Sequence, residues 1–214
     1  RGGMLAFAGE IILLVVALMW HRNRIPRRGK AALALFTVAS FLLLVWIGGH
    51  KTAERLGNIQ SARNEISDGL RTQIDRDLLR MAPHRPILGW GLGTFAYVYP
   101  RYRSFYTTLY LDEAHNDYLQ LFIEMGAAGF ATTIWFLALT FRGASKKIGI
   151  WTTDIRGALA LAAVVGIFGI LIHSLVDFNL QIPANAALFY VFCTLAAMRP
   201  DLNGADGGIG SSDI

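Results

Sequence analysis

The chain has little cysteine and little charge, and both shortages exclude whole classes of protein. Its 214 residues contain one cysteine, Cys193, which excludes a disulfide framework and a cysteine-based metal site. We expect Cys193 to be a small packing residue. Charged residues make up 16% of the chain and hydrophobic residues 54%, and the mean hydropathy is +0.42. This composition is too apolar for an ordinary soluble domain.

Acidic residues are also scarce, and the chain carries a formal net charge of +5. Such an excess can indicate nucleic-acid binding, but here it sits largely in two short segments, 22–30 and 142–156, that separate apolar runs. Basic residues in short loops are typical of the cytoplasmic side of a membrane protein. We therefore expect a lipid bilayer as partner and no nucleic acid.

Five apolar runs predict transmembrane helices. A helix needs about 20 apolar residues to cross a hydrocarbon core of roughly 30 Å, and lipid offers the backbone no other hydrogen-bonding partner. Proline is absent from all five runs, which are 4–20, 31–49, 118–141, 158–176 and the short 184–198. The predicted fold is all-α: a polytopic integral membrane protein with a single membrane domain over 1–198. Because the chain opens on Arg1 and not on Met, we expect a fragment of a larger protein.

The two basic loops fix the predicted orientation. If both are cytoplasmic, residues 50–114 form a long external loop and the short turn at 177–183 also lies outside. Residues 199–214 then form a cytoplasmic tail, and their Gly, Ser and Asp content predicts disorder.

The external loop is too long for a simple connector, and loops of this length are usually functional or disordered. Hydrophobic residues recur in it every four positions, at Ile66, Leu70, Ile74 and Leu78, and polar residues fill the positions between them. This spacing predicts an amphipathic helix. Such a helix either rests on the membrane surface or packs on the helix bundle.

Two further tracts follow in the loop. Residues 86–95, PILGWGLGTF, have alternating glycines but match neither GxGxxG nor a P-loop. We expect a tight backbone turn, with amides that hold an anion as the lesser alternative. The aromatic tract over 95–110 predicts an interfacial belt. A platform for sugar rings, with Arg101 and Arg103 meeting phosphates, is compatible with it.

His115 lies in DEAHNDYLQ, where the hydrophilic loop meets an apolar run. The helicase DEAH motif needs a preceding strand and a P-loop, which this context does not supply, and neither HExxH nor GxSxG occurs. We expect Asp112 to cap the following helix. An imidazole at this boundary is either structural or a proton-transfer group near neutral pH, and the residue pattern leaves both open.

Other ionisable residues fall inside or near the apolar runs. His173 and Asp177 are four residues apart and point the same way on a helix, and we favour a structural role for the pair. Glu10 and Glu124 are functional suspects by their place in the runs, but the sequence identifies no partner for either.

The order of these motifs resembles the O-antigen ligase and polymerase superfamily. The shared features are an Arg-Gly-Gly opening a span, an arginine-bearing amphipathic helix, RPILGWGLGTF, EAHNDYLQLFIEMGAAG and HSLVDFNLQIPANAALF. The resemblance covers nearly the whole chain and corresponds to the C-terminal part of such a protein. It implies a bacterial inner-membrane glycosyltransferase that acts on undecaprenyl-diphosphate-linked glycans, with the long loop facing the periplasm.

The resemblance also implies site residues. His115 is the expected catalytic base, and Arg71 and Arg1 are expected to hold the diphosphate. Guanidinium groups suit that task because they pair with phosphate oxygens, so no cofactor or metal is expected. Acceptors in this superfamily are glycans, glycolipids or proteins. Further substrate contacts are expected from Arg76, Arg80, Arg101, Arg103, Asn116 and Tyr118.

The rival hypothesis is a polysaccharide transporter or a flippase-like protein without enzymatic activity. Transporters often have internal repeats and helices broken by Gly or Pro near the midplane. Here the polar residues are concentrated in one outer loop and proline is absent from the runs, which favours chemistry on a lipid-borne substrate at the membrane surface.

Overall fold

The computed structural model describes residues 2–20, 34–35, 37–39, 42, 62–108 and 110–198, and within them it contains helices and no strand. The predicted all-α class is therefore confirmed. The main helices are α1 (Gly2–Trp20), α3 (Ala62–Met81), α4 (Phe95–Val98), α5 (Asp117–Ile148), α6 (Ile155–His173) and α7 (Pro183–Ala197). Three short 3₁₀ turns join them, at Ala82–His84 (η1), Tyr99–Arg101 (η2) and Asn179–Gln181 (η3).

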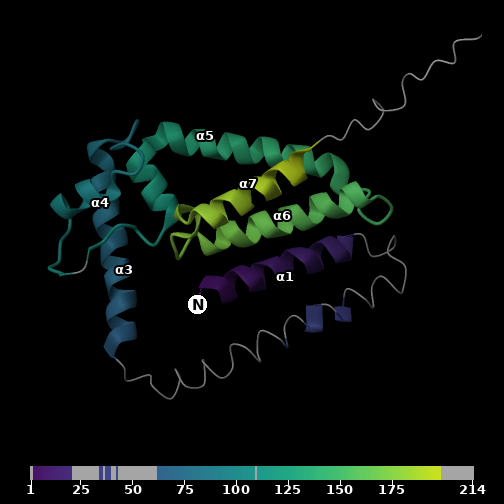
Figure 1. The fold of residues 1–214 in the computed structure, drawn as a ribbon, viewed down its shortest axis with the longest axis horizontal. Coiled ribbons are helices and arrows are strands. Elements are labelled where there is room, and N and C mark those ends of the chain that lie inside the picture. The colour runs from purple at the N-terminus through teal and green to yellow at the C-terminus, as the bar shows by residue number, and fades with distance from the viewer. Residues whose placement is uncertain are drawn as a thin grey trace, which may run out of the picture.

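Four helices run side by side in one bundle, and α3 stands across one end of it (Figure 1). Within the bundle α6 contacts α1 and α7, and α5 contacts α6 and α7. Small side chains let the helices approach closely, as is common in membrane bundles. The free Cys193 is buried among them, in a packing role as predicted. The buried cluster consists of Ala144, Ala163, Ile167, Phe189, Cys193 and Ala196.

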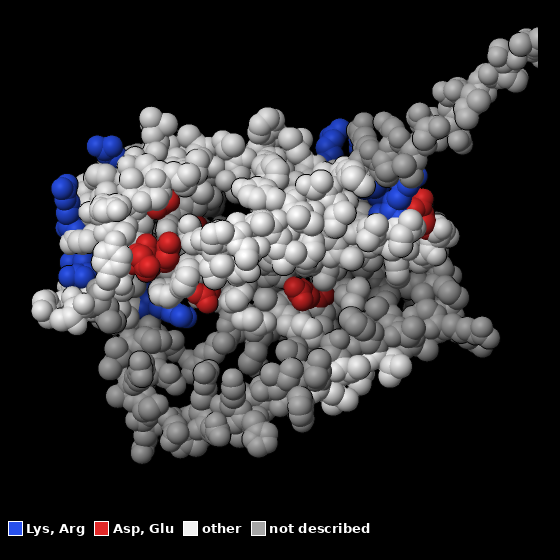
Figure 2. Space-filling view, in the orientation of Figure 1, with Lys and Arg blue, Asp and Glu red and all other residues white. Residues whose placement is uncertain are grey.

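Two of these helices, α5 and α6, are long and apolar enough to cross a membrane, whereas the apolar helical stretches Leu5–Ala17 and Pro183–Ala197 are shorter. Figure 2 shows Lys and Arg side chains at the two ends of the bundle and a largely uncharged band between them. Four of the five predicted spans thus correspond to helices, but the count of five is not confirmed. The predicted span 31–49 lies mostly outside the described residues, and the start of the long loop and the tail 199–214 lie outside them.

The predicted amphipathic helix is α3, and it packs on the bundle. Ile74, Leu78 and Met81 are buried in a cluster with Ala114, just before α5, and Ile123 in α5. Of the two positions left open for this helix, packing on α5 is therefore the observed one. The described part of the long loop, residues 62–108 and 110–114, is a folded layer at one end of the bundle (Figure 1).

The aromatic tract contributes to the same layer, which corrects part of its interpretation as an interfacial belt. Phe95 and Tyr99 are fully buried and their rings stack with centroids 5.0 Å apart. The Tyr99 hydroxyl donates to the buried carboxylate of Asp77 at 3.3 Å. Burial, and then the Asp77 charge, raise the pKa of Tyr99, so the phenol stays protonated and keeps donating. Only Tyr97, Tyr106 and Tyr110 remain largely exposed.

Helix α5 is broken at Gly126, whose φ and ψ of 62° and −166° are not helical. The predicted span over 118–141 corresponds to this helix, and the break at Gly126 is a feature that the sequence did not predict. A short first leg carries residues 117–125, and a longer second leg leaves the corner at a steep angle (Figure 1). A glycine adopts this positive φ readily because it lacks a Cβ.

Residues 86–95, called the glycine segment below, fill this break. The amides of Ala127 and Ala128 donate to the carbonyls of Pro86 and Ile87 at 2.8 and 3.0 Å. In the other direction, segment amides at positions 90 and 91 donate to carbonyls at positions 123 and 124 of the first leg at 2.9 and 2.8 Å. Backbone groups that a broken helix would leave unpaired are thus satisfied by protein, the condition for non-helical backbone at membrane depth.

The tight turn predicted for this segment is confirmed, and two backbone amides at its end are paired within the protein. Gly89, Gly91 and Gly93 all have positive φ. The carboxylate of Glu124 accepts the backbone N–H of Gly93 at 2.9 Å and of Phe95 at 3.2 Å. Glu124 therefore has the partner that its sequence context did not reveal.

Candidate functional site

His115 sits on a strained turn immediately before α5. Its φ is 57°, and among the described residues it is the one non-glycine residue with positive φ. This conformation costs about 1–2 kcal/mol for an L-residue, and such strain is concentrated at functional sites. Asn116 caps the helix: its side chain accepts the N–H groups of Tyr118 and Leu119, each at 3.2 Å. The predicted cap, Asp112, was wrong because it lies outside the first turn of a helix that begins at Asp117.

Gln120 holds the chain on the N-terminal side of this turn. Its side-chain oxygen accepts the buried N–H of Ala114 at 2.8 Å, and its amide nitrogen donates to Glu113. Burial raises the pKa of Glu113 despite that donation. The side chain that fixes the turn therefore comes from the first turn of α5, so the strained residue and the helix form one unit.

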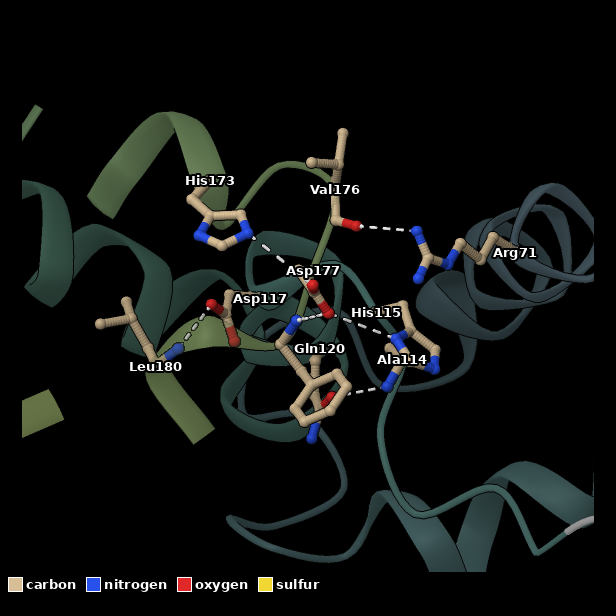
Figure 3. A network of polar contacts seen from close by, with 10 residues as sticks. Arg71, Ala114, His115, Asp117, Gln120, His173, Val176, Asp177 and Leu180 are labelled. Carbon is tan, nitrogen blue, oxygen red and sulfur yellow. Dashed lines mark hydrogen bonds and ion pairs between the residues drawn. The ribbon is translucent and has the colours of Figure 1, made fainter. Parts of the chain in front are cut away.

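The His115 ring faces the turn between α6 and α7 (Figure 3). Its Nδ1 lies 3.4 Å from Oδ1 of Asp177, and the ring of Phe178 contacts it edge-on with centroids 4.8 Å apart. Both side chains are about one-third exposed, at 30% for His115 and 38% for Asp177. A carboxylate at Nδ1 favours the tautomer with the proton on that nitrogen, which leaves the lone pair on Nε2, on the ring edge away from Asp177.

The turn that carries Asp177 is fixed to α5. The N–H of Asp117 donates to the carbonyl of Ser174 at 3.0 Å, and its carboxylate accepts the N–H of Leu180 at 2.9 Å. The Tyr118 hydroxyl donates to the carbonyl of Leu171 on α6 at 2.8 Å. The two segments that face each other across the site are thus joined directly by hydrogen bonds.

Arg71 reaches the same turn from α3. Its Nη1 lies 3.4 Å from the carbonyl oxygen of Val176, next to Asp177. Asp75 follows one helical turn later on the same face of α3, and it is a site residue that the sequence did not single out. Burial raises the pKa of Asp75, and the nearby His115 acts in the opposite direction.

The other expected arginines do not converge here. At 3.6 residues per turn, Arg76 and Arg80 lie about 140° and 180° around the helix from Arg71, and both are exposed. Nη1 of Arg80 is 3.8 Å from Oδ1 of Asp77. Arg101 is exposed, and Arg103 lies 5.9 Å above the ring of Phe105.

Of the residues expected at the site, the structure therefore brings together Arg71 and His115, with Asn116 and Tyr118 in the capping and packing roles described above. Arg1 lies outside the described residues. His173 and Asp177 were expected to form a structural pair. Oδ2 of Asp177 is 3.7 Å from Nε2 of His173, and its other oxygen faces His115. Among the described residues no group of three or more His, Cys, Asp or Glu side chains is arranged to hold a metal ion.

Comparison with known proteins gives one match. A family model described as O-antigen ligase matches residues 1–134. The matched range includes Arg1, Arg71 and His115, whereas His173 and Asp177 lie beyond it. Comparisons with curated proteins and with solved structures gave no match.

Proposed function

The chain belongs to the O-antigen ligase family, and from that premise we propose that it moves a glycan from an undecaprenyl-diphosphate carrier to an acceptor hydroxyl. The family and the apolar helices make it a membrane glycosyltransferase of the O-antigen ligase type. We place it in the bacterial inner membrane, with residues 50–114 facing the periplasm. The basic residues in the short connection between α5 and α6 support this orientation.

In the proposed reaction His115 is the general base. Nε2 takes the proton of the acceptor hydroxyl while the oxygen attacks the anomeric carbon, and the bond from that carbon to the diphosphate oxygen breaks with its electron pair. Asp177 at Nδ1 stabilises the imidazolium as the proton arrives. A positioned base of this kind typically contributes about 10²- to 10⁴-fold to the rate. A single displacement inverts the anomeric configuration.

Arg71 has the complementary task of holding the leaving group. Negative charge grows on the diphosphate as the glycosyl bond breaks, and a guanidinium meets it with paired hydrogen bonds. Nη1 of Arg71 donates to the Val176 carbonyl, and this contact holds the side chain beside His115. By the family resemblance Arg1 is the second arginine of this set. With arginines carrying the charge, the proposed step uses no metal or cofactor.

One observation carries this proposal. Arg71 from α3 and His115 from the turn before α5 meet adjacent residues, Val176 and Asp177, each across 3.4 Å. A base and a cation for the leaving group are thus held on one turn of the chain, at the charged end of an apolar bundle. This arrangement suits glycosyl transfer from a lipid diphosphate, because a cation can meet the charge that develops on the leaving group.

The test is transfer by the full-length protein in proteoliposomes, with a labelled lipid-linked glycan. His115→Ala and Arg71→Ala should each abolish transfer while the protein still inserts. His84→Ala and Arg142→Ala are matched controls, because both side chains are exposed away from the site, and they should keep wild-type rates. Wild-type rates in both site variants would overturn the assignment. Offering a glycolipid core, a growing glycan and a protein in turn identifies the acceptor.

The break in α5 does not support the transporter alternative. Broken helices in transporters leave backbone groups and helix ends that bind substrate or ions. At Gly126 those groups are already paired with the segment around Pro86 and Ile87. Flux of an ion or a glycan in proteoliposomes that contain no acceptor would reverse this preference.

A further inference from the structure

The two oxygens of the Asp177 carboxylate have different partners, and the proposed function uses one of them. Oδ1 accepts the backbone N–H of Phe178 at 3.0 Å and faces Nδ1 of His115 at 3.4 Å. Oδ2 faces Nε2 of His173 at 3.7 Å. The carboxylate therefore lies between two imidazoles (Figure 3).

The position of His173 is determined by an ordered turn. It is the last residue of α6, and its carbonyl accepts the N–H of Val176 at 3.0 Å. The preceding turn closes with Ser174 N–H on the carbonyl of Ile170 at 2.9 Å. Since the Ser174 carbonyl also accepts the Asp117 N–H, the backbone between the two side chains is held at several points. The pair is thus more constrained than two flexible side chains on a surface.

A carboxylate held at only one oxygen can rotate about its Cβ–Cγ bond. Rotation of Asp177 would take Oδ1 away from Nδ1 of His115, and the imidazole would lose the partner that selects its tautomer. A catalytic histidine in the wrong tautomer presents N–H instead of a lone pair to the hydroxyl it must deprotonate. A polar ring beside Oδ2, as that of His173 is at 3.7 Å, opposes this rotation by electrostatic attraction.

We propose that His173 is a positioning residue for the proposed base, because its ring, with Nε2 3.7 Å from Oδ2, fixes the Asp177 carboxylate in the orientation that holds His115. This inference rests on the proposed function. His173 acts through Asp177 and touches neither the glycan nor the diphosphate.

Other charged groups surround this chain of contacts. Arg71 and Asp75 face it from α3, and Asp117 from α5. From α1, Glu10 reaches the α6 surface one turn before His173: a Cβ built on Gly169 would lie 1.7 Å from its Oε1.

The test compares three side chains at position 173 in the full-length protein, with labelled lipid-linked glycan in proteoliposomes. His173→Gln keeps an amide donor close to the place of Nε2, whereas His173→Leu keeps the bulk and removes the donor. We expect kcat of His173→Leu to fall by up to about 10²-fold, the effect of a misplaced catalytic group. The KM for the glycan donor should not change, and His173→Gln should retain most of the activity.

A double-mutant cycle with Asp177→Asn separates positioning from damage to the fold. If His173 acts through Asp177, His173→Leu should lower kcat little further in the Asp177→Asn background, because residues in one network are not additive. Multiplicative losses would overturn the inference, as would equal losses in His173→Gln and His173→Leu. If His173→Leu does not insert, His173→Asn takes its place, because its shorter amide does not reach Oδ2.

The outcome also separates this inference from the function on which it rests. Loss of transfer in His115→Ala with wild-type kcat in His173→Leu overturns the positioning role alone. Wild-type transfer in His115→Ala overturns the proposed base, and the positioning role with it.

Discussion

The break in α5 allows a test of how far the glycine segment supports the site. Gly126 has φ 62° and ψ −166°, a region that is essentially restricted to glycine and costs a substituted residue about 1–3 kcal/mol. A Cβ there would lie 2.4 Å from the backbone of Ile87 and 2.6 Å from the N atom of Gly89. Because backbone cannot rotate away as a side chain can, Gly126→Ala must push the segment out of the break.

The magnitude follows from the bonds that would be lost. Four backbone hydrogen bonds join the segment to the two legs of α5, and each contributes about 0.5–1.5 kcal/mol. Together with the strain at Gly126, the loss is several kcal/mol, a large part of the about 5–15 kcal/mol that stabilises a typical fold. For a chain of this size, each kcal/mol lowers Tm by about 2–4 °C.

The assay is thermal unfolding of the detergent-solubilised full-length protein, followed by size-exclusion chromatography. Two glycines serve as controls because a Cβ on either meets nothing within 4 Å. Gly93→Ala introduces strain alone, since its φ is 71°, and should lower Tm by a few degrees. Gly149→Ala, with φ −58°, should change little. If Gly126→Ala unfolds at the same temperature as Gly93→Ala, the segment does not support the break as described.

Two further predictions concern the site itself. Asn116→Ala removes the cap of α5 and should cost about 1 kcal/mol of stability. It should also reduce transfer, because the His115 turn directly precedes the cap. Asp112→Ala should change neither stability nor transfer, and equal losses in the two variants would contradict the capping assignment. Burial raises the pKa of Asp75, so ionised Asp75 destabilises the folded state. This destabilisation is full above the raised pKa and is absent below the ordinary pKa of an aspartate. Asp75→Asn should therefore raise Tm at pH 7, and the gain should shrink as the pH falls toward 4; a gain that grows with acidity would refute this sign.

Much of the molecule was predictable because the relevant signals are local. The spacing of Ile74 and Leu78 predicted the buried face of α3, and the apolar runs predicted the positions of α1, α5, α6 and α7. The glycine pattern predicted a tight turn. The family resemblance was confirmed by the family match. A local signal for the cap is also present, since Asn116 stands directly before the helix and asparagine is as good a cap residue as aspartate.

The remaining features depend on segments that are distant in the chain. Nothing near Gly126 shows that residues 86–91 will pair with the open backbone of α5, and nothing near Glu124 shows that its partners are the N–H groups of Gly93 and Phe95. Hydrophobic periodicity reports which face of a helix is buried, not which segment covers it.

The sequence by itself determined an all-helical chain with membrane-length apolar helices and an arginine-bearing amphipathic helix. It also determined that a histidine lies at the boundary between the hydrophilic loop and an apolar helix. Only the tertiary structure decided which groups His115 meets. The turn after α6 folds back to the start of α5, and its hydrogen bonds to Asp117 fix it there. Asp177 therefore reaches Nδ1 of His115, and Arg71 reaches the adjacent carbonyl. Charge and hydrogen bonding act over a few ångströms in space, whatever the separation in sequence, so the partners of His115 were determined by the fold.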